Sequence, residues 1–116
     1  MTRAEKIAEV DRVYEELWPT IWRKEPANIG VYYYWDRWKR RHSTDWRACK
    51  GFGDLAWHTA GSLSGAACPR CRSIWLNLSN LTSRADIRQT LYHELLHLRH
   101  PSWDEEKVAA EAERLQ

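Results

Sequence analysis

Apolar residues recur along the chain first at helical spacing, then at alternate positions, and then at helical spacing again. Five of them near the amino terminus lie three or four residues apart, which predicts a helix. They are Ile7, Val10, Tyr14, Leu17 and Ile21. Thr2 and Glu5 have the spacing of a capping box at the start of this helix, and Pro19 is expected to end or bend it.

The middle of the chain contains three candidate strands. Segment 28–35 (NIGVYYYW) is rich in β-branched and aromatic residues, and segment 53–60 (GDLAWHTA) is a second candidate. In segment 73–79 (SIWLNLS) apolar residues alternate with others, which predicts a strand with one apolar face. That face would consist of Ile74, Leu76 and Leu78. The Gly/Ser/Ala-rich segment 59–67 is expected to be a loop that joins the last two strands as a hairpin.

A second helix is predicted at about residues 84–99, where Ser83 and Asp86 provide a starting signal. It should end before Pro101, because a residue that precedes proline is pushed out of the helical region. Its apolar stripe would consist of Ile87, Leu91, Leu95 and Leu98.

A short terminal helix follows, with Ser102 and Glu105 as a further capping-box pair. Its apolar stripe would consist of Val108, Ala112 and Leu115. The order helix, three short strands, helix, helix describes an α+β architecture. A chain of 116 residues is the length of one domain, so residues 1–116 are predicted to share a single core.

The second helix carries the letters HELLH at residues 93–97. His93 and His97 are one turn apart, roughly 135° around the helix from the apolar stripe, so both imidazoles can converge on one Zn²⁺ ion. Glu94 lies between the two faces, where it could take a proton from a water molecule activated by that ion. The sequence therefore predicts a zinc site with Glu94 as general base. The alternative is an exposed helix face that carries His, Glu and His by chance.

Such a site needs a third protein ligand, and the residues after the motif offer several. On a continuous helix His100 would stand about 10.5 Å along the axis from His93, too far to share one tetrahedral ion unless the chain unwinds. Asp104 and Glu105 flank the apolar stripe of the terminal helix, although either could instead serve as a helix cap or first-turn charge. Glu105 has the longer reach and is the preferred ligand, with Asp104 and His100 as alternatives.

With "HELLHLRHP" the chain resembles the zincin metallopeptidases, and more narrowly their small SprT-like and minimal gluzincin-type members. The likeness spans about residues 28–107, but only the H-E-x-x-H motif is highly specific. It implies a zincin-like domain and a peptide or protein substrate. The chain departs from the family at Trp103, where the commonest short SprT-like spacing would place a third histidine. Either a nearby carboxylate takes that role or the site is degenerate.

The resemblance also implies that the strand before the metal helix runs along the edge of the active-site cleft. An extended substrate would then pair with that strand. The residues concerned are Ile74, Trp75, Leu76 and Asn77. The alternative is an ordinary strand within the sheet. A hydrogen-bond donor for the tetrahedral intermediate could come from His100, from Tyr92 or from one of three consecutive tyrosines. These are Tyr32, Tyr33 and Tyr34.

The chain contains three cysteines, an odd number that argues against a disulfide framework. Cys68 and Cys71 form a C-x-x-C knuckle, which together with Cys49 and His58 would make a second, structural zinc site. Free thiols or a reversible disulfide are the alternatives.

The segment "WDRWKRRHSTDWR" mixes five basic residues with three tryptophans, a combination that can contact phosphates and stack on bases. Nucleic-acid binding is therefore considered, although charged runs are more often solvated faces. The net charge of +2 is too small to indicate a polyanionic partner by itself. No apolar run is long enough to span a bilayer, and the amino terminus does not resemble a secretory signal, which favours the cytoplasm.

The sequence thus predicts a zinc-dependent metalloprotease that hydrolyses peptide bonds. The alternative is a non-catalytic, zinc-stabilised binding module for nucleic acid or a protein partner that keeps a zincin-like shell.

Overall fold

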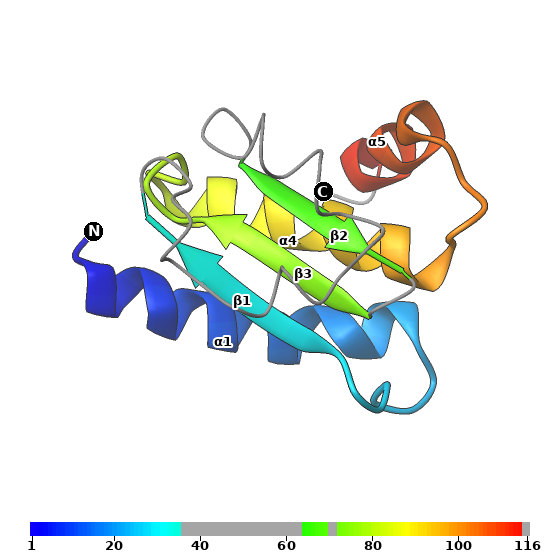
Figure 1. Ribbon diagram of the computed structural model, residues 1–116, viewed down its shortest axis with the longest axis horizontal. Coiled ribbons are helices and arrows are strands. Elements are labelled where there is room, and N and C mark those ends of the chain that lie inside the picture. Colours follow the sequence, from blue (N-terminus) through cyan, green and yellow to red (C-terminus); the bar gives the residue numbers. More distant parts are fainter. Residues whose placement is uncertain (36–63, 70–71, 115–116) are drawn as a thin grey trace.

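A computed structural model describes residues 1–35, 64–69 and 72–114. Within these ranges it contains three helices and a small mixed sheet, so the predicted α+β class is confirmed (Figure 1). The elements are α1 (Arg3–Ile21), β1 (Gly30–Tyr34), β2 (Gly65–Cys68), β3 (Ser73–Asn77), α4 (Arg84–Arg99) and α5 (Glu105–Arg114). In the described part of the chain, no helix is both long enough and apolar enough to cross a membrane.

The strand β3 lies at the centre of the sheet, between β1 and β2 (Figure 1). It pairs in parallel with β1, where Val31 is opposite Ile74, and antiparallel with β2, where Ala66 is opposite Trp75. All five residues of β3 are buried, so both of its faces are covered. Apolar residues do alternate with others in segment 73–79, as expected. The alternation does not separate a buried face from an exposed one, because both faces are buried.

Residues 74–77, which were expected to pair with a substrate strand, all belong to β3. The topology of the sheet shows that this expectation is wrong. The backbone of β3 is already hydrogen-bonded to a neighbour on each side, which leaves it no open edge. The side chains expected to touch substrate are also buried, at 1% exposed or less. They are Ile74, Trp75, Leu76 and Asn77.

The strand boundaries differ from those expected. The first strand begins at Gly30, after Asn28 adopts a positive φ of 61°, and the last ends at Asn77, whose side-chain oxygen accepts the Ser79 N–H at 3.2 Å. Residues 65–67, expected to form a loop, belong instead to β2 because they pair with β3. The candidate strand 53–60 lies outside the described residues.

Both α1 and α4 cover the same face of the sheet (Figure 1). Side chains from both helices, from β3 and from α5 meet there in one apolar cluster. Its fully buried members include Val13, Ile74, Leu76, Ile87, Leu91, Leu95 and Val108. Burying each of these side chains contributes about 1.5–3 kcal/mol to the free energy of folding. The packing of this cluster is therefore the main interaction that fixes the position of α4.

The capping box predicted at the start of α1 is confirmed. The Thr2 hydroxyl accepts the Glu5 N–H at 3.1 Å, and Glu5 accepts the Thr2 N–H at 2.9 Å. The helix does not end at Pro19 but continues to Ile21. Proline removes only one backbone donor there, and Thr20 donates its hydroxyl to the Leu17 carbonyl at 2.7 Å, which satisfies one acceptor of the last turn.

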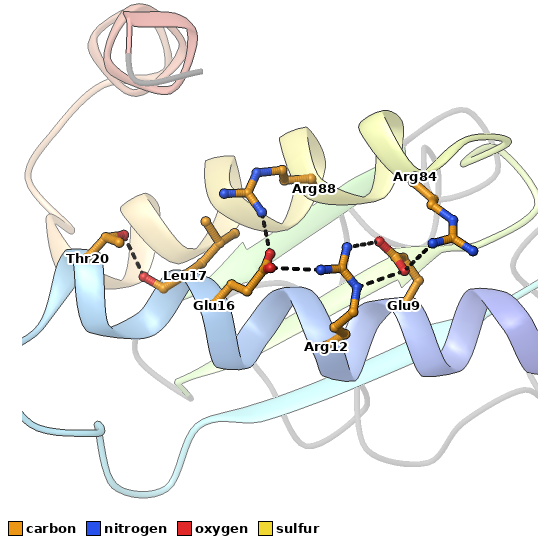
Figure 2. Close-up of polar contacts among 7 residues, drawn as sticks. All are labelled: Glu9, Arg12, Glu16, Leu17, Thr20, Arg84 and Arg88. Atoms are coloured by element: carbon orange, nitrogen blue, oxygen red, sulfur yellow. Dashed lines mark hydrogen bonds and ion pairs between the residues drawn. The ribbon is translucent and has the colours of Figure 1, made fainter.

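A polar network on the outer side joins α1 to α4 (Figure 2). Glu16 binds Arg12 of its own helix at 2.7 Å and Arg88 of α4 at 2.6 Å. The buried Glu9 carboxylate binds Arg12 and lies 3.8 Å from the Arg84 guanidinium. The hydrogen bond from Arg12 holds the pKa of Glu9 below its usual value. The pairs made by Glu16 are exposed and worth little, so the network aligns two helices that apolar burial already holds together.

Candidate metal centre

The helix α4 presents the HELLH motif on the side that faces α5. The helix begins directly after the predicted cap Ser83, whose hydroxyl accepts the Asp86 N–H at 3.1 Å. Leu91 and Leu95 are fully buried in the core, which turns His93 and His97 away from it. The two imidazole rings lie 5.0 Å apart between their centroids. Their side chains are 22% and 19% exposed, so an ion or a substrate could reach them from solvent.

Helix α5 brings the Glu105 carboxylate onto both histidines. One Glu105 oxygen lies 2.5 Å from Nε2 of His93, and the other lies 2.7 Å from Nε2 of His97. Partial burial opposes ionisation of this carboxyl, but the neighbouring imidazoles outweigh it and hold the pKa of Glu105 below its usual value. Because an ionised carboxylate only accepts, each imidazole donates its Nε2–H to Glu105. Three side chains from two helices thus converge on one point.

The two adjacent carboxylates, Asp104 and Glu105, have different roles. Asp104 accepts the Lys107 N–H at 2.8 Å and therefore serves as the amino-terminal cap of α5. The expected capping box of Ser102 with Glu105 is wrong, because the helix begins at Glu105, two residues later than that box requires. Capping by Asp104 leaves the Glu105 side chain, 72% exposed, available to the histidines.

Glu94 is buried beside this cluster and does not share its solvent exposure. It is 6% exposed, and burial, reinforced by the charge of Glu105, raises its pKa to about 8. One of its oxygens lies within 4.8 Å of a nitrogen from each of His93 and His97. This is a distance at which a carboxyl group can exchange a proton with a water molecule held between them.

The strand β2 forms the wall that buries Glu94. A Cβ atom added to Gly65 would come within 2.7 Å of Thr90 Cγ2 and 3.2 Å of a Glu94 oxygen. Gly65 has no positive φ, so space and not backbone conformation explains this glycine. The absence of a side chain at this one position lets the strand approach the helix closely enough to enclose the carboxyl.

The donor set fits a zinc ion. Two imidazole nitrogens and one carboxylate are the protein ligands of a common class of catalytic zinc site, which leaves a position for water. Here the Glu105 carboxylate hydrogen-bonds Nε2 of both histidines, and a Glu94 oxygen and one nitrogen of each histidine lie within 4.8 Å of one another. That these residues bind metal stays a prediction.

The alternative third ligands occupy other positions. His100 stacks on Trp103, with ring centroids 3.7 Å apart and planes 5° from parallel. Burial, followed by the charges of Arg99 and Lys107, lowers the pKa of His100. Asp104 is the helix cap described above.

The candidate donors for a tetrahedral intermediate are spread over the fold. Tyr92 belongs to the apolar core, and burial raises its pKa. Tyr32 stacks on Trp75 with 5.8 Å between centroids, and Tyr33 is exposed. The described contacts bring neither Tyr32 nor Tyr33 to the histidines. The side chain of Tyr34 lies outside the described part of the structure.

Most of the predicted structural zinc site lies outside the described residues. Cys68 is the last residue of β2 and is buried, whereas Cys49, His58 and Cys71 are not described. The basic segment 36–47 is not described either.

Comparisons of the chain with protein-family models, with curated proteins and with solved structures found no match, so the site is interpreted from its own geometry.

Proposed function

We propose that this protein is a zinc-dependent metallopeptidase with a minimal zincin-like domain. The observation that carries the proposal is the placement of Glu105, which reaches Nε2 of both His93 and His97 while Glu94 lies buried within 4.8 Å of their ring nitrogens. Chance would account for a His-Glu-His helix face, but not for a carboxylate from another helix directed at both imidazoles. The order of helix, small mixed sheet and motif-bearing helix also supports a zincin-like arrangement.

His93, His97 and Glu105 would hold the ion. A bound Zn²⁺ would supply Lewis-acid chemistry, which makes a water molecule more acidic and polarises a peptide carbonyl. Glu94 would accept the proton of the attacking water and pass it to the leaving amine. Its role as base requires the ionised form, which a neighbouring cation favours and the metal-free pocket disfavours.

The substrate would lie along β2. Among the described strands β2 forms the edge of the sheet on the α5 side, and Gly65 brings its backbone next to Glu94. An extended peptide alongside this strand would carry its scissile bond past the carboxyl group. This arrangement replaces the role first expected for β3.

The test compares wild type, Glu94→Gln and His97→Ala for bound zinc and for cleavage of a broad peptide library. We expect Glu94→Gln to keep its zinc and lose about 10²–10⁴-fold in cleavage rate, because general acid–base catalysis contributes that much. His97→Ala should lose both zinc and activity. Glu106→Gln, a neutralised neighbour of Glu105 with no described contact at the site, is the matched control and should behave as wild type.

Equal cleavage by wild type and Glu94→Gln would contradict the mechanism. A protein that cuts nothing, and holds no zinc once its cysteines are replaced, would contradict the whole proposal. Zinc binding that survives His97→Ala, together with salt-sensitive nucleic-acid binding, would favour the non-catalytic binding module.

A further inference from the structure

The turn between α4 and α5 contains an aromatic stack that has no role in the proposed chemistry. Only residues 100–104 separate the two helices. Within them His100 stacks face to face on Trp103, and the Trp103 N–H donates to the His100 carbonyl at 3.0 Å. The indole also packs against the apolar core, and Lys107 Nζ lies 4.6 Å from the centroid of its ring.

These contacts tie the turn to both helices. His100 caps α4, since its N–H donates to the Leu96 carbonyl at 2.8 Å. Lys107 belongs to the first turn of α5, and its backbone is held by Asp104. Trp103 therefore contacts the capping residue of one helix, the first turn of the next and the apolar core.

The position of Glu105 depends on this turn as well as on the packing of α5 through Val108, because Glu105 is the first residue of α5. Its side chain is 72% exposed, and its hydrogen bonds among the described residues are those to the two imidazoles. A long exposed glutamate loses much rotamer freedom when it is fixed, so a ligand of this kind binds well only if its backbone is already placed. Glu105 is the first residue of α5 and follows Trp103 by two positions.

We infer that Trp103 is a positioning residue for the metal ligand Glu105. This inference rests on the proposed function only in requiring that His93, His97 and Glu105 bind zinc. The stack of Trp103 on His100 sets the angle at which α5 leaves α4, and that angle delivers the carboxylate to the histidines.

The test measures the Zn²⁺ dissociation constant by competition with a chelator, counting only the zinc that is lost in His97→Ala. Trp103→Ala should weaken binding about 10–100-fold, as other outer-shell changes around metal sites do. In a Glu105→Ala background the same substitution should have no further effect, because the side chain that Trp103 positions is gone. A purely structural role would weaken binding equally in both backgrounds.

His100 provides a second pair of variants, which retain the packing of the indole on the core. His100→Ala removes the stack and should weaken zinc binding. His100→Phe retains a ring that can stack and cannot bind metal, and it should keep wild-type affinity. Loss of affinity in His100→Phe equal to that in His100→Ala would overturn the inference, since it would make His100 itself the ligand.

Two results separate this inference from the proposed function. If wild type binds no zinc through His93 and His97, both fail. If wild type binds zinc there but Trp103→Ala and His100→Ala bind it equally well, only the positioning role fails.

Discussion

At the scale of single residues, Glu94 shows the clearest conflict between burial and charge. The carboxyl is buried between α4 and β2, where the ionised form is disfavoured and its pKa rises to about 8. Such a group lowers stability in the metal-free protein above its ordinary pKa. This combination is typical of functional sites rather than of structural carboxylates.

A pH-dependent stability follows from that pKa. In the metal-free protein the folded state holds a proton on Glu94 that the unfolded state releases above its ordinary pKa of about 4.5. The free energy of unfolding should therefore fall as pH rises from about 5 to about 8, by on the order of a few kcal/mol. Glu94→Gln, which has no proton to lose, should not show this fall.

The measurement is urea denaturation of chelator-treated protein at several pH values in that range. Other titrating groups, including Glu105, are present in both proteins, so the difference between wild type and Glu94→Gln isolates the one carboxyl. Glu106→Gln should follow wild type. Parallel curves for wild type and Glu94→Gln would show that Glu94 is not buried as described.

At the scale of elements, two adjacent carboxylates at the start of α5 have different roles. Asp104 caps the helix and Glu105 reaches the histidines. Local sequence could not assign these tasks, because either residue is acceptable at a helix start. The assignment depends on where the turn after His100 ends, and that turn is fixed by a stack between side chains.

Conservative amide substitutions should separate the two tasks. Asp104→Asn should retain both stability and zinc affinity, because asparagine caps a helix about as well as aspartate. Glu105→Gln should keep its stability and lose at least about tenfold in zinc affinity, since a neutral amide oxygen binds Zn²⁺ more weakly than a carboxylate. Isothermal titration with Zn²⁺ gives the affinities. The reverse order of effects would identify Asp104 as the ligand.

The helices were the most predictable elements, because their signals are local. The capping box at Thr2, the cap at Ser83 and the apolar spacing in residues 84–99 are each contained within a few turns. The strand β2 was missed because glycine and alanine have low strand propensity. It is a strand through its pairing with β3, and through the small residues that let it lie close to α4.

At the scale of the whole molecule, the central position of β3 could not be inferred from its sequence alone. An alternating pattern in 73–79 is compatible with an edge strand, and only the pairing with both β1 and β2 shows that no edge is open. The site was more predictable than the sheet. Its histidines share one helix face and the buried Glu94 follows the first of them in sequence, so only the carboxylate from α5 required knowledge of how two helices pack.

The central claim is that His93, His97 and Glu105 bind one zinc ion next to Glu94. The most direct measurement is an anomalous difference map, recorded at the zinc absorption edge, from crystals grown with Zn²⁺. We expect a peak about 2.0–2.2 Å from Nε2 of His93, from Nε2 of His97 and from one Glu105 oxygen, with Glu94 outside the coordination shell. No peak between the two histidines, or one in which Glu105 takes no part, would contradict it.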